Sequence, residues 1–151
     1  SKRKSIKVIH QTNEKNILSL NKFYSENNIE NKIFSFDENF ISTIQQADLC
    51  ITRAGASTLA ELSLLNIPFI AVPLPNSKDN HQLENALFYK NNDCCWIIEQ
   101  KHFESEIERV LDEILEVKRS LLKKKENLKR LNYQNTWINV NQKITKTINE
   151  N

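Results

Sequence analysis

Apolar residues follow two periods that alternate along the chain. Short continuous or alternating apolar runs, typical of strands, are separated by stretches with apolar side chains at helical spacing. The expected strands cover residues 5–10, 32–36, 49–51, 69–72 and 94–98. The expected helices between them cover residues 17–24, 38–46, 56–65 and 81–90. Because such alternation requires right-handed crossovers, the predicted fold class is α/β, a doubly wound parallel sheet.

From Phe103 onward the pattern is helical throughout. Apolar stripes run through residues 107–115 and 121–131, and a final amphipathic piece is expected at residues 136–148. We therefore divide the chain into an α/β domain, residues 1–115, and a helical C-terminal tail, residues 116–151, packed on the same domain.

The only glycine of the chain, Gly55, lies between an expected strand and an expected helix. The first amides of a helix lack intrahelical partners, so the N–H groups of Ala56, Ser57 and Thr58 could hold a phosphate. Glu61, about one turn further, could accept two hydrogen bonds from vicinal hydroxyls. The pair Thr58 and Glu61 also fits a capping box, which needs no ligand. Both interpretations remain open at this stage.

Polar residues follow the other expected strands. Asp37, Arg53, His81 and Gln82 all lie after strands, and the carboxyl ends of parallel strands meet at one edge of the sheet. His10 also ends a strand, and it could equally be a hydrogen-bonded loop residue. We expect a ligand at this edge.

Charge narrows the classes of partner. The chain has 21 Lys and Arg against 19 Asp and Glu, a net charge of +2, which gives no reason to expect a nucleic-acid partner. The basic runs at residues 2–4 and 123–125 are interpreted as solvated faces or, on a membrane-facing enzyme, as contacts with anionic lipid. No apolar run approaches the ~18 residues of a membrane span, so contact with a bilayer is expected to be peripheral.

Known chemical motifs are few. The three cysteines, Cys50, Cys94 and Cys95, lie in apolar runs without zinc spacing, which favours buried reduced thiols in a cytosolic protein. No metal cluster, Ser-His-Asp order, P-loop or GxGxxG sequence is present, so no metal or cofactor is expected.

Three ordered motifs carry a family resemblance. They are ADLCITRAGASTLAE at residues 47–61, IPFIAVPLP at residues 67–75, and DNHQ at residues 79–82 followed by Asn85-Ala86. Together they resemble the C-terminal domain of the MurG-type transferases, which move N-acetylglucosamine from UDP onto undecaprenyl-pyrophosphoryl-muramyl-pentapeptide in peptidoglycan synthesis. His10-Gln11 resembles the His-Gln that ends an earlier strand of that domain.

The resemblance implies a fold, an activity and partners. The fold would be the Rossmann-like C-terminal half of a GT-B enzyme without its first strand and glycine-rich loop. Residues 1–115 would bind the donor, UDP-N-acetylglucosamine, for inverting hexosyl transfer without a cofactor. The lipid-linked muramyl-pentapeptide acceptor and the catalytic base would belong to an N-terminal domain that this chain lacks, so the chain alone is not expected to be active. The protein would be cytoplasmic and peripheral on the inner membrane surface.

Residue roles also follow from the resemblance. Glu61 would bind the ribose hydroxyls, residues 56–58 the pyrophosphate, and His81 and Gln82 the sugar or its phosphate.

Asp37 would meet uracil through its main chain, and Arg53 would support its loop or add positive charge.

Two alternative functions remain open: a non-catalytic UDP-sugar-binding subunit of a split glycosyltransferase, and a UDP-sugar hydrolase or epimerase.

Overall fold

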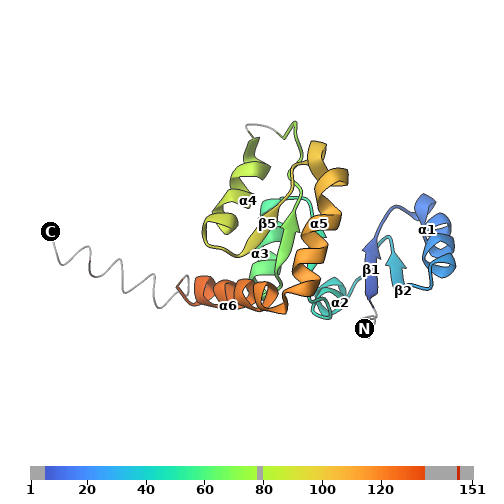
Figure 1. Cartoon of the computed structure of the whole chain (residues 1–151), viewed down its shortest axis with the longest axis horizontal. Helices are drawn as coiled ribbons and strands as arrows, with labels where there is room; N and C mark the ends of the chain where they lie inside the picture. The colour runs from blue at the N-terminus through green and yellow to red at the C-terminus, as the bar shows by residue number, and fades with distance from the viewer. Residues whose placement is uncertain (1–5, 78–79, 135–145, 147–151) are drawn as a thin grey trace. The chain divides into compact units, whose positions relative to one another are not determined.

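The computed structural model describes residues 6–77, 80–134 and 146, which divide between two compact units, residues 1–47 and 48–151. Each unit contains a parallel sheet and helices (Figure 1). The helix expected at residues 136–148 lies outside the described residues, apart from Lys146. Within the described segments, no helix is both long enough and apolar enough to cross a membrane.

The first unit is a two-stranded parallel sheet with a crossover helix. In chain order its elements are β1 (Lys7–Gln11), α1 (Glu14–Glu26), β2 (Glu30–Phe34) and α2 (Phe40–Ile44). Helix α1 packs on β2 and buries Tyr24, whose hydroxyl lies 2.8 Å from Nδ1 of His10 near the end of β1. His10 is therefore a hydrogen-bonded residue.

Strand β2 differs from the expected strand at residues 32–36 by two residues. It ends at Phe34 because its five residues pair in register with the five of β1. Beyond it the chain turns, and the Asp37 carboxylate accepts a hydrogen bond from the N–H of Asn39 at 2.8 Å. Phe36, expected inside the strand, is 77% exposed.

The second unit contains a three-stranded parallel sheet in the order β3-β4-β5. Its elements agree with the expected ones to within two residues where both are defined. They are β3 (Cys50–Thr52), α3 (Ala56–Leu64), β4 (Phe69–Ala71), α4 (His81–Asn91), β5 (Cys95–Ile97), η2 (Gln100–His102), α5 (Phe103–Glu116) and α6 (Lys118–Gln134).

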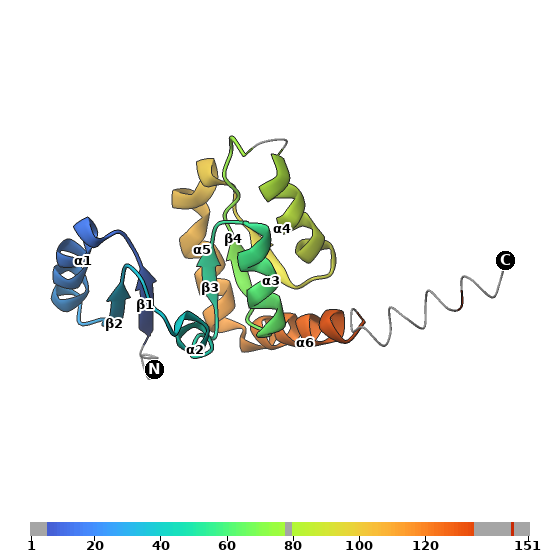
Figure 2. The ribbon, with the colours of Figure 1, turned by 180° about the vertical axis from the view of Figure 1, so that it is seen from behind.

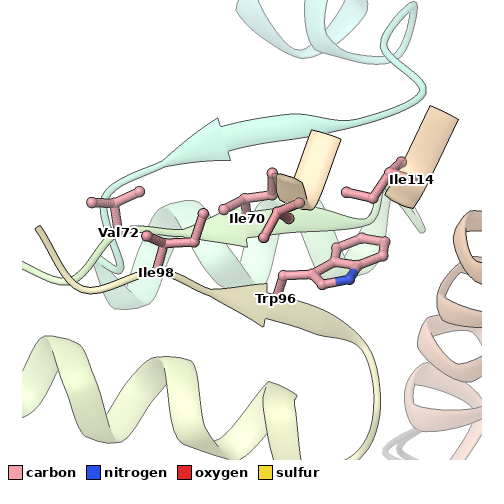
Figure 3. Packing of buried hydrophobic residues seen from close by; sticks show 6 residues of the cluster. Ile70, Val72, Trp96, Ile98 and Ile114 are labelled. Carbon is pink, nitrogen blue, oxygen red and sulfur yellow. The ribbon is translucent and has the colours of Figure 1, made fainter. Parts of the chain in front are cut away.

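Helices cover both faces of this sheet. Along the central strand, side chains alternate between the two faces. Ile70 packs with Trp96 and with Ile114 of α5 on one face (Figure 3). Phe69 makes an edge contact with Tyr89 of α4 on the other, with ring centroids 5.3 Å apart. The predicted α/β class, with a doubly wound parallel sheet, is confirmed.

Helix α6 lies at the amino end of the sheet, opposite the beginning of α4 (Figure 2). Lys124 donates to the carboxylate of Asp93, in the turn before β5, at 2.7 Å and lies 4.4 Å from the ring centroid of Trp96. Further along α6, Asn132 donates to the carbonyl of Ser63 at 2.6 Å. The helix thus binds the last turn of α3 and the turn that precedes β5, and it leaves the carboxyl edge uncovered.

The three cysteines are free thiols. Cys94 and Cys95 are buried and Cys50 is partly buried. Burial raises the pKa of Cys50 to about 11, of Cys94 to about 11 and of Cys95 to about 12. They are packing residues of low thiolate content, because the thiolate form is the reactive one.

Candidate functional site

At the carboxyl edge of the three-stranded sheet, two loops are hydrogen-bonded to Gln82 and Asn85, near the start of α4. The side-chain amide of Asn85 donates to the carbonyl of Ala54, just before α3, at 3.1 Å. The side-chain oxygen of Gln82 accepts from the N–H of Leu74, in the loop after β4, at 3.0 Å. One helical turn therefore holds both loops in place.

Arg53 contributes a third link across this edge. Its Nη1 donates to the carbonyl of Val72 at 3.3 Å, while the side chain remains exposed. A guanidinium has five N–H donors, so most of its donor capacity faces solvent at the edge of the sheet.

Helix α3 begins at Ala56, with Gly55 as its N-cap in an extended conformation and without a side-chain capping bond. The first backbone bond is from Leu59 to the carbonyl of Gly55, at 3.0 Å. Among the described hydrogen bonds, none involves the N–H groups of Ala56, Ser57 or Thr58. These three donors point out of the positive end of the helix, which is the arrangement that binds phosphate in other proteins.

The capping-box interpretation is wrong. Because Gly55 is the N-cap, Thr58 occupies the third helical position and cannot act as the N-cap partner of Glu61. Glu61 lies four residues after Ser57, so both share one face of α3. Glu61 is partly buried, and the described hydrogen bonds and ion pairs do not engage its carboxylate.

Among the residues that the structure describes, none requires a glycine at position 55. Its φ of −67° is accessible to any residue, and an added Cβ would meet only the Thr58 Oγ1, at an ordinary 3.9 Å. A glycine in such a position commonly serves the close approach of a ligand to the backbone. This observation therefore favours a ligand at the start of α3.

His81 and Gln82 open α4 after Asn80, which adopts a left-handed conformation with φ of 54°. The N–H of Gln82 also donates to the hydroxyl of Ser77, at 3.4 Å. The structure thus brings Arg53, the start of α3 and the start of α4 to one edge, as the sequence predicts.

Asp37 belongs to the first unit, and its carboxylate is engaged within its own loop. One oxygen accepts from the Thr43 hydroxyl at 2.7 Å and from Lys32 at 2.9 Å, and the other accepts from the Asn39 N–H. These bonds, led by that of Thr43, lower the pKa of Asp37 to about 2. The carboxylate therefore shapes the turn, and a contact with a ligand would fall to the main chain.

Sequence reasoning did not assign roles to Asn85 or Thr43, although both hold the loops of candidate residues. The position of Asn85 one turn after His81 placed it on α4 but did not indicate its bond to Ala54. In the part of the chain that the structure describes, no group of three or more His, Cys, Asp or Glu residues is arranged to hold a metal ion.

The sequence was also compared with known protein families. Residues 1–137 match the glycosyltransferase family 28 C-terminal domain. The chain belongs to this family. The predicted family resemblance is thereby confirmed.

Two relatives show how much of a family member this chain represents. One relative is the UDP-N-acetylglucosamine–N-acetylmuramyl-(pentapeptide) pyrophosphoryl-undecaprenol N-acetylglucosamine transferase of Pelagibacter ubique. The two sequences are 45% identical in an alignment that covers 100% of this chain and 43% of the relative. The other relative is the protein of the same name from a Sulfurovum species. It is 38% identical over 118 residues, which cover 78% of this chain and 35% of the relative. The chain therefore spans less than half the length of these curated relatives.

A solved structure of a family member has the same fold. The crystal structure of Acinetobacter baumannii MurG superposes with a TM-score of 0.73 and 25% identity, covering 83% of this chain and 37% of that one. The predicted likeness to the Rossmann-like C-terminal half of a GT-B enzyme is confirmed by this match.

Proposed function

We propose that this chain is the donor-binding part of a glycosyltransferase that transfers N-acetylglucosamine from UDP-N-acetylglucosamine to a lipid-linked muramyl-pentapeptide in peptidoglycan synthesis. The observation that carries the proposal is the start of α3, where three N–H donors lie beside a glycine that its described surroundings do not require. The family match and the names of the relatives supply the substrate class.

In this proposal the pyrophosphate of UDP binds the N–H groups of Ala56, Ser57 and Thr58. Glu61 accepts hydrogen bonds from the ribose hydroxyls, and Arg53 adds positive charge. Amides and a helix dipole that are fixed before the reaction stabilise the charge that develops on the departing UDP, with no need for a metal ion. The chain thus contributes to the leaving-group side of the transfer.

His81 and Gln82 are proposed to contact the sugar or its phosphate, and Asp37 to contact uracil through its main chain. Residues 1–115 form the donor-binding domain in this proposal, with residues 116–151 as its helical tail. Acceptor binding and proton removal would belong to the remainder of a longer protein, placed in the cytoplasm on the inner face of the membrane.

Titration of the chain with UDP, followed by calorimetry, tests the proposal. We expect saturable binding of UDP and of UDP-N-acetylglucosamine, and no consumption of the sugar nucleotide without an acceptor. Absence of UDP binding would contradict the proposal, and loss of the sugar nucleotide without an acceptor would favour a hydrolase or epimerase.

Gly55→Ala should weaken UDP binding by about 10-fold, because the added methyl group would occupy the space of a phosphate at the helix start. The free energy of unfolding should stay within about 1 kcal/mol of the wild-type value, since φ at position 55 suits alanine. Titration and thermal melting measure the two quantities. A fall in stability with unchanged affinity would show that the glycine serves only the fold.

Gln82→Ala should weaken binding of UDP-N-acetylglucosamine by roughly 3–10-fold, the value of one or two hydrogen bonds, and leave UDP binding nearly unchanged. Because the variant also loses the bond to Leu74, Ser77→Ala is the matched control. It loosens the same loop without removing the proposed sugar contact. Equal effects of the two variants on both ligands would assign Gln82 to loop order alone.

A further inference from the structure

The loop at residues 35–39 is held by a hydrogen-bond network that joins three elements of the first unit. Lys32 lies in β2, Asp37 in the loop and Thr43 in α2. The Thr43 hydroxyl donates to the Asp37 carboxylate at 2.7 Å, and the Lys32 ammonium donates to each of these two groups at 2.9 Å. The loop is therefore fixed both to the strand before it and to the helix after it.

The network is largely shielded from water. Thr43 is only 3% exposed, and the Asp37 side chain is 14% exposed. Hydrogen bonds to a charged group are stronger than those between neutral groups, and an acceptor that loses its donor in such a place is costly. The pKa of Asp37, lowered to about 2 by these bonds, keeps the carboxylate charged at neutral pH. The Asp37 side chain is thus committed to its own loop.

The same aspartate closes the turn that leads into α2. Its other carboxylate oxygen accepts from the N–H of Asn39 at 2.8 Å, and its carbonyl accepts from the N–H of Phe40 at 3.2 Å. The rings of Phe34 and Phe40 make an edge contact across the ends of the loop, with centroids 6.3 Å apart. The conformation of the loop therefore depends on the position of Asp37.

The main chain of Asp37 has hydrogen-bonding capacity left. Among the described hydrogen bonds, none engages its N–H, and its carbonyl can accept a second bond beyond that from Phe40. The neighbours Phe36 and Glu38 are exposed, so the segment is accessible to solvent. Asp37 therefore offers a main-chain donor and a main-chain acceptor at a position that its side chain fixes.

A fixed donor and acceptor can distinguish the two pyrimidine bases. Uracil has an N3–H donor beside the O4 acceptor, whereas cytosine has an N3 acceptor beside a 4-amino donor. Main-chain groups placed to match one of these patterns oppose the other, and the unpaired polar groups that result are costly. The discrimination is lost when the loop can move, because it then adapts to either base.

We propose that Thr43 and Lys32 are positioning residues for base selection. Acting through the Asp37 carboxylate, they hold the loop at residues 35–39 in the conformation that accepts uracil and rejects cytosine. The inference rests on the proposed function, which assigns the main chain of Asp37 to uracil. It adds that the selectivity of this contact is set by two side chains that do not touch the nucleotide.

Titration of the full chain with UDP and with CDP tests the inference through the ratio of the two dissociation constants. Wild type should prefer UDP by roughly 100-fold, since two hydrogen bonds are mismatched with cytosine. Thr43→Val keeps the shape of the side chain but removes the hydroxyl, and it should lower this preference by about 10-fold. Partial unfolding alone would weaken the apparent binding of both nucleotides by the same factor and leave the ratio unchanged.

Two further variants of the network keep the test decisive if Thr43→Val folds poorly. Thr43→Ser retains the hydroxyl and should restore the preference to within about two-fold of wild type. Lys32→Met removes the ammonium but keeps an unbranched side chain, and it should lower the preference by roughly 3–10-fold.

The matched control is Ser42→Ala in the same helix. The Ser42 hydroxyl donates to the carbonyl of Asn39 at 2.8 Å and is exposed, so the variant also removes one hydroxyl bond from α2 but leaves the Asp37 carboxylate with its partners. It should keep the preference for UDP within about two-fold of wild type.

The outcomes separate this inference from the proposed function. If wild type binds UDP and CDP equally, or if Thr43→Val and Lys32→Met keep the wild-type preference, the inference is overturned and the donor site is retained. An equal loss of preference in Ser42→Ala would also overturn it, because the effect would then not depend on Asp37. Absence of UDP binding by wild type would contradict the proposed function and this inference together.

Discussion

Glu61→Gln should weaken UDP binding by roughly 100-fold and leave thermal stability almost unchanged. A carboxylate that accepts two hydrogen bonds from ribose hydroxyls contributes about 1.5–3 kcal/mol per charged bond, and partial exposure reduces the sum. Stability should be retained because Glu61 has no capping role, since Gly55 is the N-cap of α3. Isothermal titration and thermal melting measure the two effects.

The matched control is Glu108→Gln, which removes one exposed carboxylate from α5. It changes the net charge by the same amount and should leave UDP affinity within about two-fold of wild type, because α5 is outside the proposed site. If Glu61→Gln binds UDP like this control, the ribose assignment is wrong.

Asp93→Asn should lower the free energy of unfolding by about 1–3 kcal/mol. The variant leaves the ammonium of Lys124, whose side chain is 8% exposed, without its carboxylate partner. Breaking a fully buried pair costs roughly 3–5 kcal/mol, and the effect here is smaller because the Asp93 side chain is 46% exposed. Asparagine tolerates the positive φ of 52° at this position, so backbone strain should not contribute. Urea denaturation measures the change.

Lys123→Gln is the control for the same carboxylate. Lys123 also pairs with Asp93, but its side chain is 67% exposed, and such pairs contribute about 0–1 kcal/mol. The double variant Asp93→Asn with Lys124→Met should lose less free energy of unfolding than the two single variants lose together, since no buried charge then remains. If Asp93→Asn loses no more free energy of unfolding than Lys123→Gln, then the buried ammonium of Lys124 is not stabilised by the Asp93 carboxylate.

The ion pair of Asp93 and Lys124 should also affect how the free energy of unfolding depends on pH. Hydrogen bonds from Lys123 and then Lys124 lower the pKa of Asp93 from 3.8 to about 2. A carboxyl group with a lowered pKa in the folded protein stabilises it fully above its unfolded pKa and loses this contribution as pH falls towards the folded value. Wild type should therefore lose stability between about pH 4 and pH 2 more steeply than Asp93→Asn. The comparison is needed because the pKa of Asp37 is lowered to about 2 as well.

Local pattern predicted the elements well because each signal lies within a few residues. The apolar run at residues 69–72 indicated a strand covered on both faces, and β4 is buried on both. The glycine followed by Ala-Ser-Thr predicted a helix from Ala56, where α3 begins. The strand at residues 32–36 was displaced by two residues because parallel pairing with β1 sets its limits.

The candidate site was likewise predicted in part from the sequence and in part only from the structure. Its position at the carboxyl edge follows from strand order, and Arg53, His81 and Gln82 lie there as predicted. The choice between phosphate site and capping box needed the structure, because it depends on whether Gly55 or Thr58 is the N-cap. The bonds that hold the loops also needed it.

The sequence by itself determined the alternation of strands and helices, the α/β class and the family, since these depend on periodicity and on ordered motifs. The tertiary structure alone decided which polar side chains hold the loops and the helical tail. Asn85 and Ala54 are 31 residues apart, as are Lys124 and Asp93, and Asn132 lies 69 residues from Ser63. Such pairs have no periodic signal in the sequence, because they form only after the sheet has brought distant turns together.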